Sequence, residues 1–298
     1  MSRRLKELEV ELVCDAQSVL GEGPLWDTSS DRLYWVDIYS HRIHGYDPGR
    51  PGQFETMSAG PFVSSIVPRL SGGFAITQED GFYRYDPASG ASAPLALVET
   101  ELPGNRFNDG KCDPAGRYVA GTMSRIDEPG RGSLYSLGSD GTVRRLLDGV
   151  GTSNGLAWSD DGRTMYYVDS QLQEIAAFDY DPATGRIAHR RVVAVIPAED
   201  GTPDGMTIDA EGMLWLAHWN GWQVSRWDPV SGERIADVSV PVAKVTSVAF
   251  GGERLDELYI TTARVGVTPE LVNDQPHAGG VFRAKPGVRG TLPFAYRG

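Results

Sequence analysis

Six polar residues recur along this chain at the head of similar runs of sequence, and most of them have side chains that suit binding of a hard divalent cation. The intervals between them are 42, 44, 46, 50 and 42 positions. A repeat of this length is typical of a β-propeller, in which equivalent positions of all blades meet around one axis. The six head residues are Glu22, Ser64, Asn108, Asn154, Asp204 and Thr246.

Four of the six head residues carry carboxylate or amide oxygens, the ligands that hard cations prefer. Two carboxylates that converge on one centre repel each other and are costly to desolvate unless a cation or protons lie between them. We therefore predict that Glu22, Asn154 and Asp204 hold one divalent metal ion in the central cavity. Calcium is the expected ion, and Zn²⁺, Mn²⁺, Mg²⁺ and Fe²⁺ are alternatives. Ser64 and Thr246 are expected to line the tunnel.

The head residues need strands to position them, and the repeat predicts those strands. After several of the head residues comes a turn that contains Asp and Gly, and an apolar strand follows that turn. Many repeats end in an aromatic residue followed by Asp-Pro, a pair that favours turns. We predict an all-β fold, a six-bladed β-propeller with a metal site in its central cavity, formed by residues 1–298 as a single domain. A strand at about residues 9–14 should complete the last blade. Asp109 and Lys111 are expected in a turn.

Composition and charge narrow the class of protein. The formal charge of −12 and a pI near 4.9 oppose binding to nucleic acid or to an anionic membrane, because both are polyanionic. No run of apolar residues is long enough to cross a membrane, and the first residues lack the apolar stretch of a signal peptide. Two cysteines, Cys14 and Cys112, are too few for a disulfide framework. We expect a cytoplasmic protein that is a monomer or a weak homo-oligomer.

Other catalytic chemistries find no support in the sequence. The five histidines are scattered without the spacing of a zinc site, and no Gly-x-Ser-x-Gly motif marks a nucleophilic serine. The Gly-rich segments lack the Lys-Ser/Thr ending of a phosphate-binding loop. If the protein is an enzyme, metal-assisted hydrolysis is the chemistry that remains.

Long motifs, in an ordered series from about Cys14 onward, give the chain a family resemblance. They are Leu20-Gly-Glu-Gly-Pro-Leu-Trp26, Arg106-Phe-Asn-Asp-Gly-Lys111, Asp113-Pro-Ala-Gly-Arg-Tyr118, Ser153-Asn-Gly-Leu-Ala-Trp158, Pro203-Asp-Gly-Met206 and Ala278-Gly-Gly-Val-Phe282. The chain thus resembles the family of regucalcin (senescence marker protein), gluconolactonase and luciferin-regenerating enzyme. This resemblance implies a six-bladed propeller with one divalent metal ion that hydrolyses sugar lactones.

The resemblance also implies roles for particular residues. Glu22, Asn154 and Asp204 match the family's metal positions, and Arg106 and Asn108 match the positions that contact the substrate. Asp204 matches the proposed general base. The implied partner is a small-molecule sugar lactone, whose carbonyl the metal polarises while Asp204 takes a proton from the attacking water. A base that also ligates the metal loses part of its basicity.

The sequence departs from the family after Gly121-Thr-Met123. Regucalcin has acidic residues there that reach the sugar hydroxyls, whereas this chain has Ser124-Arg-Ile126 before Asp127 and Glu128. The substrate could therefore be an aldonolactone other than gluconolactone, or a lactone with fewer hydroxyls or an acidic group. Two alternatives to a lactonase stay open: a phosphotriesterase or arylesterase of the paraoxonase-like type, and a non-catalytic calcium-binding propeller.

Overall fold

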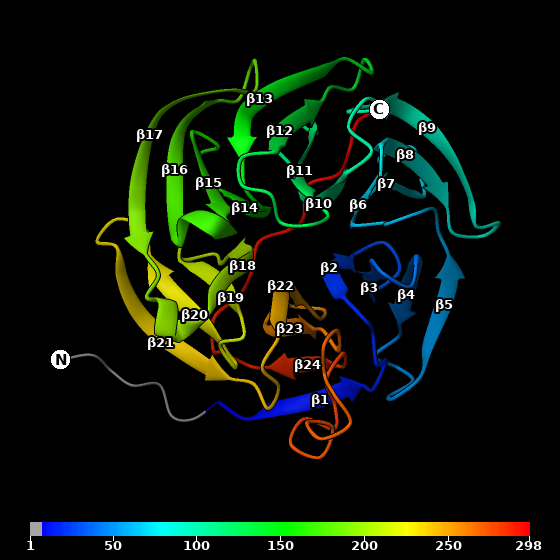
Figure 1. Cartoon of the computed structure of the whole chain (residues 1–298), viewed down its shortest axis with the longest axis vertical. Helices are drawn as coiled ribbons and strands as arrows, with labels where there is room; N and C mark the ends of the chain where they lie inside the picture. Colours follow the sequence, from blue (N-terminus) through cyan, green and yellow to red (C-terminus); the bar gives the residue numbers. More distant parts are fainter. Residues whose placement is uncertain (1–7) are drawn as a thin grey trace.

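The computed structural model describes residues 8–298, and in these residues six four-stranded antiparallel sheets form a ring (Figure 1). The predicted six-bladed β-propeller is confirmed. The prediction that the first residues form no signal peptide rests in part on residues 1–7, which lie outside the part of the chain that the structure describes. Within residues 8–298, no helix has the length and apolar character needed to cross a membrane.

The blades follow one another along the chain, and within each of the first five the strands run in chain order from the axis outward. The first three blades are β2 (Gly21–Asp27), β3 (Arg32–Asp37), β4 (Arg42–Tyr46) and β5 (Phe54–Ser58); β6 (Ser65–Pro68), β7 (Phe74–Gln78), β8 (Gly81–Asp86) and β9 (Ala91–Leu97); and β10 (Asn105–Cys112), β11 (Tyr118–Ser124), β12 (Gly132–Leu137) and β13 (Val143–Val150). The next two are β14 (Ser153–Trp158), β15 (Thr164–Asp169), β16 (Glu174–Asp181) and β17 (Arg186–Val195); and β18 (Thr202–Ile208), β19 (Leu214–Trp219), β20 (Gln223–Asp228) and β21 (Glu233–Ser239). Two short 3₁₀ helices are η1 (Ser170–Leu172) and η2 (Ala198–Asp200).

The sixth blade joins the two ends of the chain. It consists of β22 (Val245–Gly251), β23 (Glu257–Thr262), β24 (Val281–Ala284) and, as its outer strand, β1 (Val10–Cys14). Val10 lies opposite Ala284 and Leu12 opposite Phe282 in the antiparallel pair. This pairing gives the final blade its fourth strand and covers the open edge of β24.

Most of the head residues lie at a break in strand register, which turns their side chains toward the ring axis. In β2, β10, β14, β18 and β22, the pairing with the next strand shifts at the head residue, as a β-bulge does. In β6 the register is continuous, and the head residue Ser64 precedes the strand. A bulge rotates one residue out of the regular alternation, so the polar head turns inward while the rest of the strand stays in the core.

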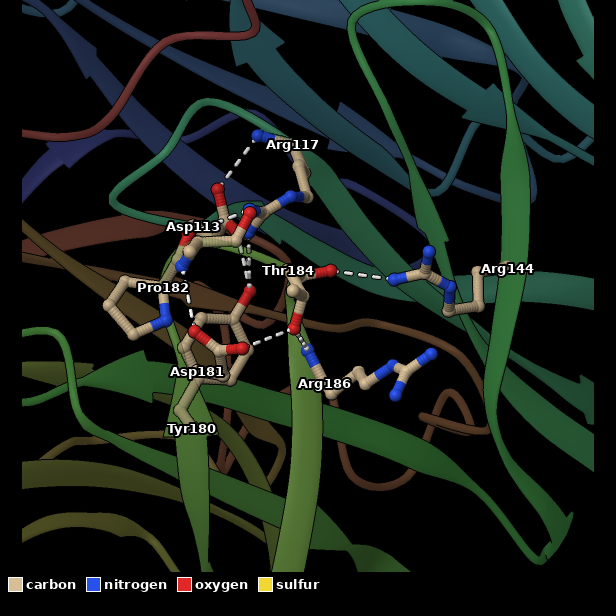
Figure 2. A network of polar contacts seen from close by, with 9 residues as sticks. Asp113, Arg117, Arg144, Tyr180, Asp181, Pro182, Thr184 and Arg186 are labelled. Atoms are coloured by element: carbon tan, nitrogen blue, oxygen red, sulfur yellow. Dashed lines mark hydrogen bonds and ion pairs between the residues drawn. The ribbon is translucent and has the colours of Figure 1, made fainter.

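Apolar side chains fill the space between blades, and a polar network joins the third and fourth blades. Trp215 of β19 packs edge-on against Phe250 of β22 with ring centroids 5.9 Å apart. Figure 2 shows Asp113, in the turn after β10, accepting hydrogen bonds from Arg117 and from Tyr180 of β16. Arg117 also donates to the carbonyl of Pro182 at 2.7 Å. These contacts hold the third and fourth blades together and keep the central strands in place.

Candidate functional site

A cavity of about 570 Å³, which we call the front cavity, lies at one end of the ring axis. It is lined by the first residues of the innermost strands, with the loops that precede them, and by the ends of the second strands, with the loops that follow them. All five residues predicted for the metal and substrate sites lie in its wall. The lining is Leu20, Glu22, Tyr39, Arg106, Asn108, Met123, Asp127, Thr152, Asn154, Ser170, Gln171, Gln173, Thr202, Asp204, Trp219, Lys244 and Val265.

The other two head residues, Ser64 and Thr246, do not line this cavity. The Ser64 hydroxyl lies 2.9 Å from Thr77 Oγ1, and Thr246 Oγ1 donates to the carbonyl of Gly21 at 2.5 Å. Both side chains are buried. They form hydrogen bonds with neighbouring strands and do not belong to the front cavity, and their place along the tunnel stays a prediction.

The amide of Asn154 is oriented by its surroundings. Ser170 Oγ donates to the carbonyl of Pro203 at 2.7 Å, so it can accept a hydrogen bond from Asn154 Nδ2, which lies 3.0 Å away. This contact fixes the amide nitrogen toward Ser170 and leaves Asn154 Oδ1 as the free acceptor. That oxygen is buried and has no hydrogen-bond donor within the described residues.

The two carboxylates of the site lack compensation. Asp204 Oδ1 is also buried without a donor in residues 8–298. Glu22 Oε2 accepts a hydrogen bond from the backbone N–H of Gly23 at 3.0 Å. Burial, with the negative charge of Asp109 nearby, raises the pKa of Asp204 well above its ordinary value. Burial and the charges of Asp204 and Asp109 do the same to the pKa of Glu22. Both shifts reflect burial and nearby negative charge, and at Glu22 the charge of Arg106 offsets them only in part.

These three residues fit a divalent cation. In the described part of the chain, no group of three or more His, Cys, Asp or Glu side chains comes together, so a site rich in histidine or thiolate is excluded there. Two carboxylates and one amide form a different donor set, all oxygen. A cation between Glu22, Asn154 and Asp204 would satisfy the two orphaned oxygens and relieve the carboxylate repulsion.

Arg106 and Asn108 form a rigid pair beside the acidic centre. Arg106 Nη1 donates to Asn108 Oδ1 at 2.7 Å and to the carbonyl of Phe107 at 2.8 Å. Asn108 Nδ2 donates to the carbonyl of Ser153 at 2.9 Å, which fixes that amide as well. Burial lowers the pKa of Arg106 from its usual value, and it stays a cation because an arginine titrates far above neutral pH. The guanidinium is therefore a fixed donor group on the cavity wall.

Aromatic rings and a second cation complete the rim. The Arg106 guanidinium carbon lies 5.9 Å from the centre of the Tyr39 ring, and Lys244 Nζ lies 4.8 Å from the centre of the Trp219 ring. Lys244 also donates to the carbonyl of Val265. Apolar faces next to fixed donors suit a small ring compound that bears oxygen atoms.

The segment after Met123, where the sequence departs from the family, contributes one acid to the cavity. Asp127 lies in the cavity wall. Arg125 does not, because it pairs with Glu79 at 2.5 Å and stacks 4.7 Å over the Phe62 ring. The cation that replaces an acid in the sequence is thus held outside the cavity.

Several wall residues were missed by the sequence analysis although a signal for them exists. Leu20, Thr152, Thr202 and Lys244, like Arg106, each stand two positions before a head residue. Alternate residues of a strand face the same side, so this offset marks the wall.

Asp37 and Asp169, by contrast, end their strands as backbone caps. Asp37 accepts from Val19 and Leu20 N–H groups, and Asp169 from those of Gly151 and Thr152.

Fold and site together define a six-bladed propeller with an acidic, amide-bearing cavity on its axis. The model of the SMP-30/gluconolactonase/LRE-like region matches residues 20–264, and the chain belongs to this family. Human regucalcin is 42% identical over 99% of this chain and 100% of its own length. A Bacillus subtilis (strain 168) protein with the provisional name sugar lactone lactonase YvrE is 40% identical over 98% of this chain and 99% of its own.

Solved structures agree with this assignment. A calcium-binding protein, regucalcin, from Agrobacterium tumefaciens superposes with a TM-score of 0.93 at 30% identity, covering 97% of this chain and 98% of that one. A luciferin-regenerating enzyme superposes with a TM-score of 0.91 at 33% identity, covering 97% and 99%. The similarity therefore extends over nearly the whole propeller.

Proposed function

We propose that this protein is a lactonase that opens a sugar-acid lactone to the free acid and uses one divalent cation. The observation that carries the proposal is the meeting of two buried carboxylates and an oriented amide oxygen beside a fixed guanidinium in one cavity. Membership of a family that includes gluconolactonases, and similarity to the Bacillus subtilis relative, support the same reaction.

Glu22, Asn154 and Asp204 would hold the cation, which supplies Lewis-acid polarisation of the lactone carbonyl when bound. The Arg106 guanidinium donates hydrogen bonds to lactone oxygens, and Asn108 holds it in place. Asp204 accepts the proton of the attacking water, and a cation bound to the same carboxylate would reduce its basicity. Tyr39 and Trp219 provide apolar faces for the ring.

The substrate we propose is an aldonolactone. Asp127 provides an acceptor for a substrate hydroxyl in the wall, and the pairing of Arg125 with Glu79 keeps that cation away from it. A polyhydroxylated ring therefore finds both donors and an acceptor in the front cavity. The proposed ion is calcium, with Zn²⁺, Mn²⁺, Mg²⁺ and Fe²⁺ as the alternatives that all-oxygen ligation allows.

The test is acid release from a panel of aldonolactones by protein dialysed against EDTA and then supplied with each metal. We expect turnover only after metal addition, and a loss of at least about a hundredfold in Asp204→Asn. Glu128→Gln is the matched control, because Glu128 is a half-exposed acid near Asp127 that does not line the cavity. It should keep full activity.

Two outcomes would refute the proposal. Metal binding without turnover on any lactone would favour the non-catalytic calcium-binding propeller. Turnover of aryl esters or phosphotriesters in preference to every lactone would favour the paraoxonase-like alternative.

A further inference from the structure

A second cavity of about 450 Å³, which we call the rear cavity, lies at the other end of the central channel. On β2, Glu22 lines the front cavity, whereas residues 23–26 line the rear one. On β18 the same change occurs between Asp204 and Thr207, and on β14 between Asn154 and Leu156. Because the innermost strands surround one axis, the two cavities occupy opposite ends of the channel.

Residues 291–294 form part of the wall of the rear cavity. The C-terminal segment that contains them crosses the ring (red in Figure 1). It is anchored on both sides: the N–H of Gly290 donates to the carbonyl of Leu255, and that of Tyr296 to the carbonyl of Pro68, each at 2.8 Å. Leu292 and Phe294 lie between these anchors. One part of the wall of the rear cavity is therefore a segment that is anchored at both ends.

The polar groups in this largely apolar cavity are unusual. We expected Asp109 and Lys111 in a turn, and this was wrong, because both lie in β10 and both line the rear cavity. Lys111 Nζ donates to the carbonyl of Met206 at 2.8 Å. Asp109 Oδ1 accepts from the N–H of Gly110 at 2.7 Å.

These contacts leave hydrogen-bonding capacity unused. Across residues 8–298, Lys111 forms no salt bridge and makes no side-chain hydrogen bond beyond that to Met206, although an ammonium group has three donors. Asp109 Oδ2 likewise has no hydrogen-bond donor in the described part of the chain.

The other buried acid in this wall, Asp209, is already satisfied. It accepts hydrogen bonds from the indole N–H of Trp215, from Arg226 and from the backbone N–H of Met213. Among the charged groups of this wall, the unused capacity belongs to Asp109 and Lys111, which stand two residues apart on one strand and line the same cavity. The buried indole N–H groups of Trp26 and Trp158 also have no acceptor within residues 8–298. The cavity thus presents one acceptor and one set of donors side by side.

We propose that the rear cavity binds a small neutral molecule with an apolar body and a head group that both accepts and donates hydrogen bonds, as a primary amide does. Its oxygen accepts from Lys111 and its N–H donates to Asp109. A negatively charged head would meet Asp109, and a positively charged one would meet Lys111, so the neutral head is preferred. Trp26, Trp158 and Phe250 of the wall contact the apolar body.

The test is a ligand-observed NMR titration of the whole protein with hexanamide, hexanoate and hexylamine, which share one chain length. We expect hexanamide to bind at least about threefold more tightly than either charged probe. Lys111→Met should weaken hexanamide binding about tenfold, the value of one hydrogen bond to a charged group. Lys244→Met is the matched control, because Lys244 lines the front cavity, and it should leave hexanamide binding unchanged.

A second variant keeps the test decisive if Lys111→Met does not fold. Ala249→Trp leaves Lys111 in place and fills the rear cavity from the wall of β22, so it should abolish hexanamide binding. The proposal is overturned if the wild-type protein does not bind hexanamide, or if a charged probe binds as well. It is equally overturned if a folded Ala249→Trp variant still binds, or if Lys244→Met weakens binding as much as Lys111→Met.

Discussion

Replacement of Glu22 by Gln should change stability in opposite directions with and without metal. In the metal-free protein at about pH 8, the substitution removes one of two buried carboxylates whose charges oppose each other. Gln keeps the shape and can still accept the N–H of Gly23. The metal-free variant should therefore be more stable than the wild-type protein, whereas the metal-loaded variant should be less stable, because the ion loses a charged ligand.

The magnitude follows from the size of the chain. An unfolding entropy of about 2.1 cal/mol/K per residue gives about 0.6 kcal/mol/K for 298 residues. An ion at about 100 times its Kd stabilises the folded state by about 2.7 kcal/mol, so it should raise the Tm of the wild-type protein by about 4 °C. Removal of a poorly compensated buried charge should raise the free energy of unfolding by about 1–2 kcal/mol. This corresponds to a Tm about 2–3 °C higher for the metal-free variant than for the metal-free wild-type protein.

The assay is thermal unfolding followed by circular dichroism, in EDTA and in a series of Ca²⁺ concentrations. Glu99→Gln is the matched control. Glu99 accepts hydrogen bonds from Asn105 Nδ2, Thr122 Oγ1 and the Tyr135 hydroxyl, and it does not line the front cavity. Its replacement should lower the Tm under both conditions and leave the metal-induced rise intact. If metal-free Glu22→Gln is less stable than wild type and keeps the full rise, the argument for a cation at Glu22 fails.

Three further predictions concern substrate binding, packing and pH. Arg106→Lys should raise KM for the lactone about tenfold with a smaller change in kcat, measured by steady-state kinetics, because lysine lacks the planar fork that binds Asn108. Gly205→Ala should destabilise the protein by about 1–3 kcal/mol in urea unfolding, since a Cβ there would lie 2.8 Å from Ser247 Cα, and a folded variant of unchanged stability would contradict this. Burial lowers the pKa of His218 to about 4 from 6.5, so the unfolded chain takes up the proton first as the pH falls. The free energy of unfolding should therefore decline between pH 6.5 and 4. His218→Gln should flatten that decline, measured by urea unfolding at several pH values.

The six-bladed architecture and most residues at the centre of the front cavity could be predicted from the sequence. The repeat predicted six blades because each blade must begin with an inner strand of the same pattern, and the heads of these strands must meet on the axis. Glu22, Asn154 and Asp204 stood out because carboxylates and amides at equivalent positions converge in any closed propeller. Arg106 was reached through the family motif, although its position two residues before a head would also have marked it.

Which head residues line the front cavity, and which other residues of the inner strands line the rear one, could not be predicted without the packing of the blades. Ser64 and Thr246 have the right spacing, yet they bond to neighbouring strands, since local register and not the repeat sets where a hydroxyl points. The sequence around Asp109 and Lys111 predicts a turn. In the structure both residues belong to β10, and after the bulge in that strand they line the rear cavity. A one-residue break in register redirects every side chain beyond it, and no short-range sequence pattern records which break a strand will adopt.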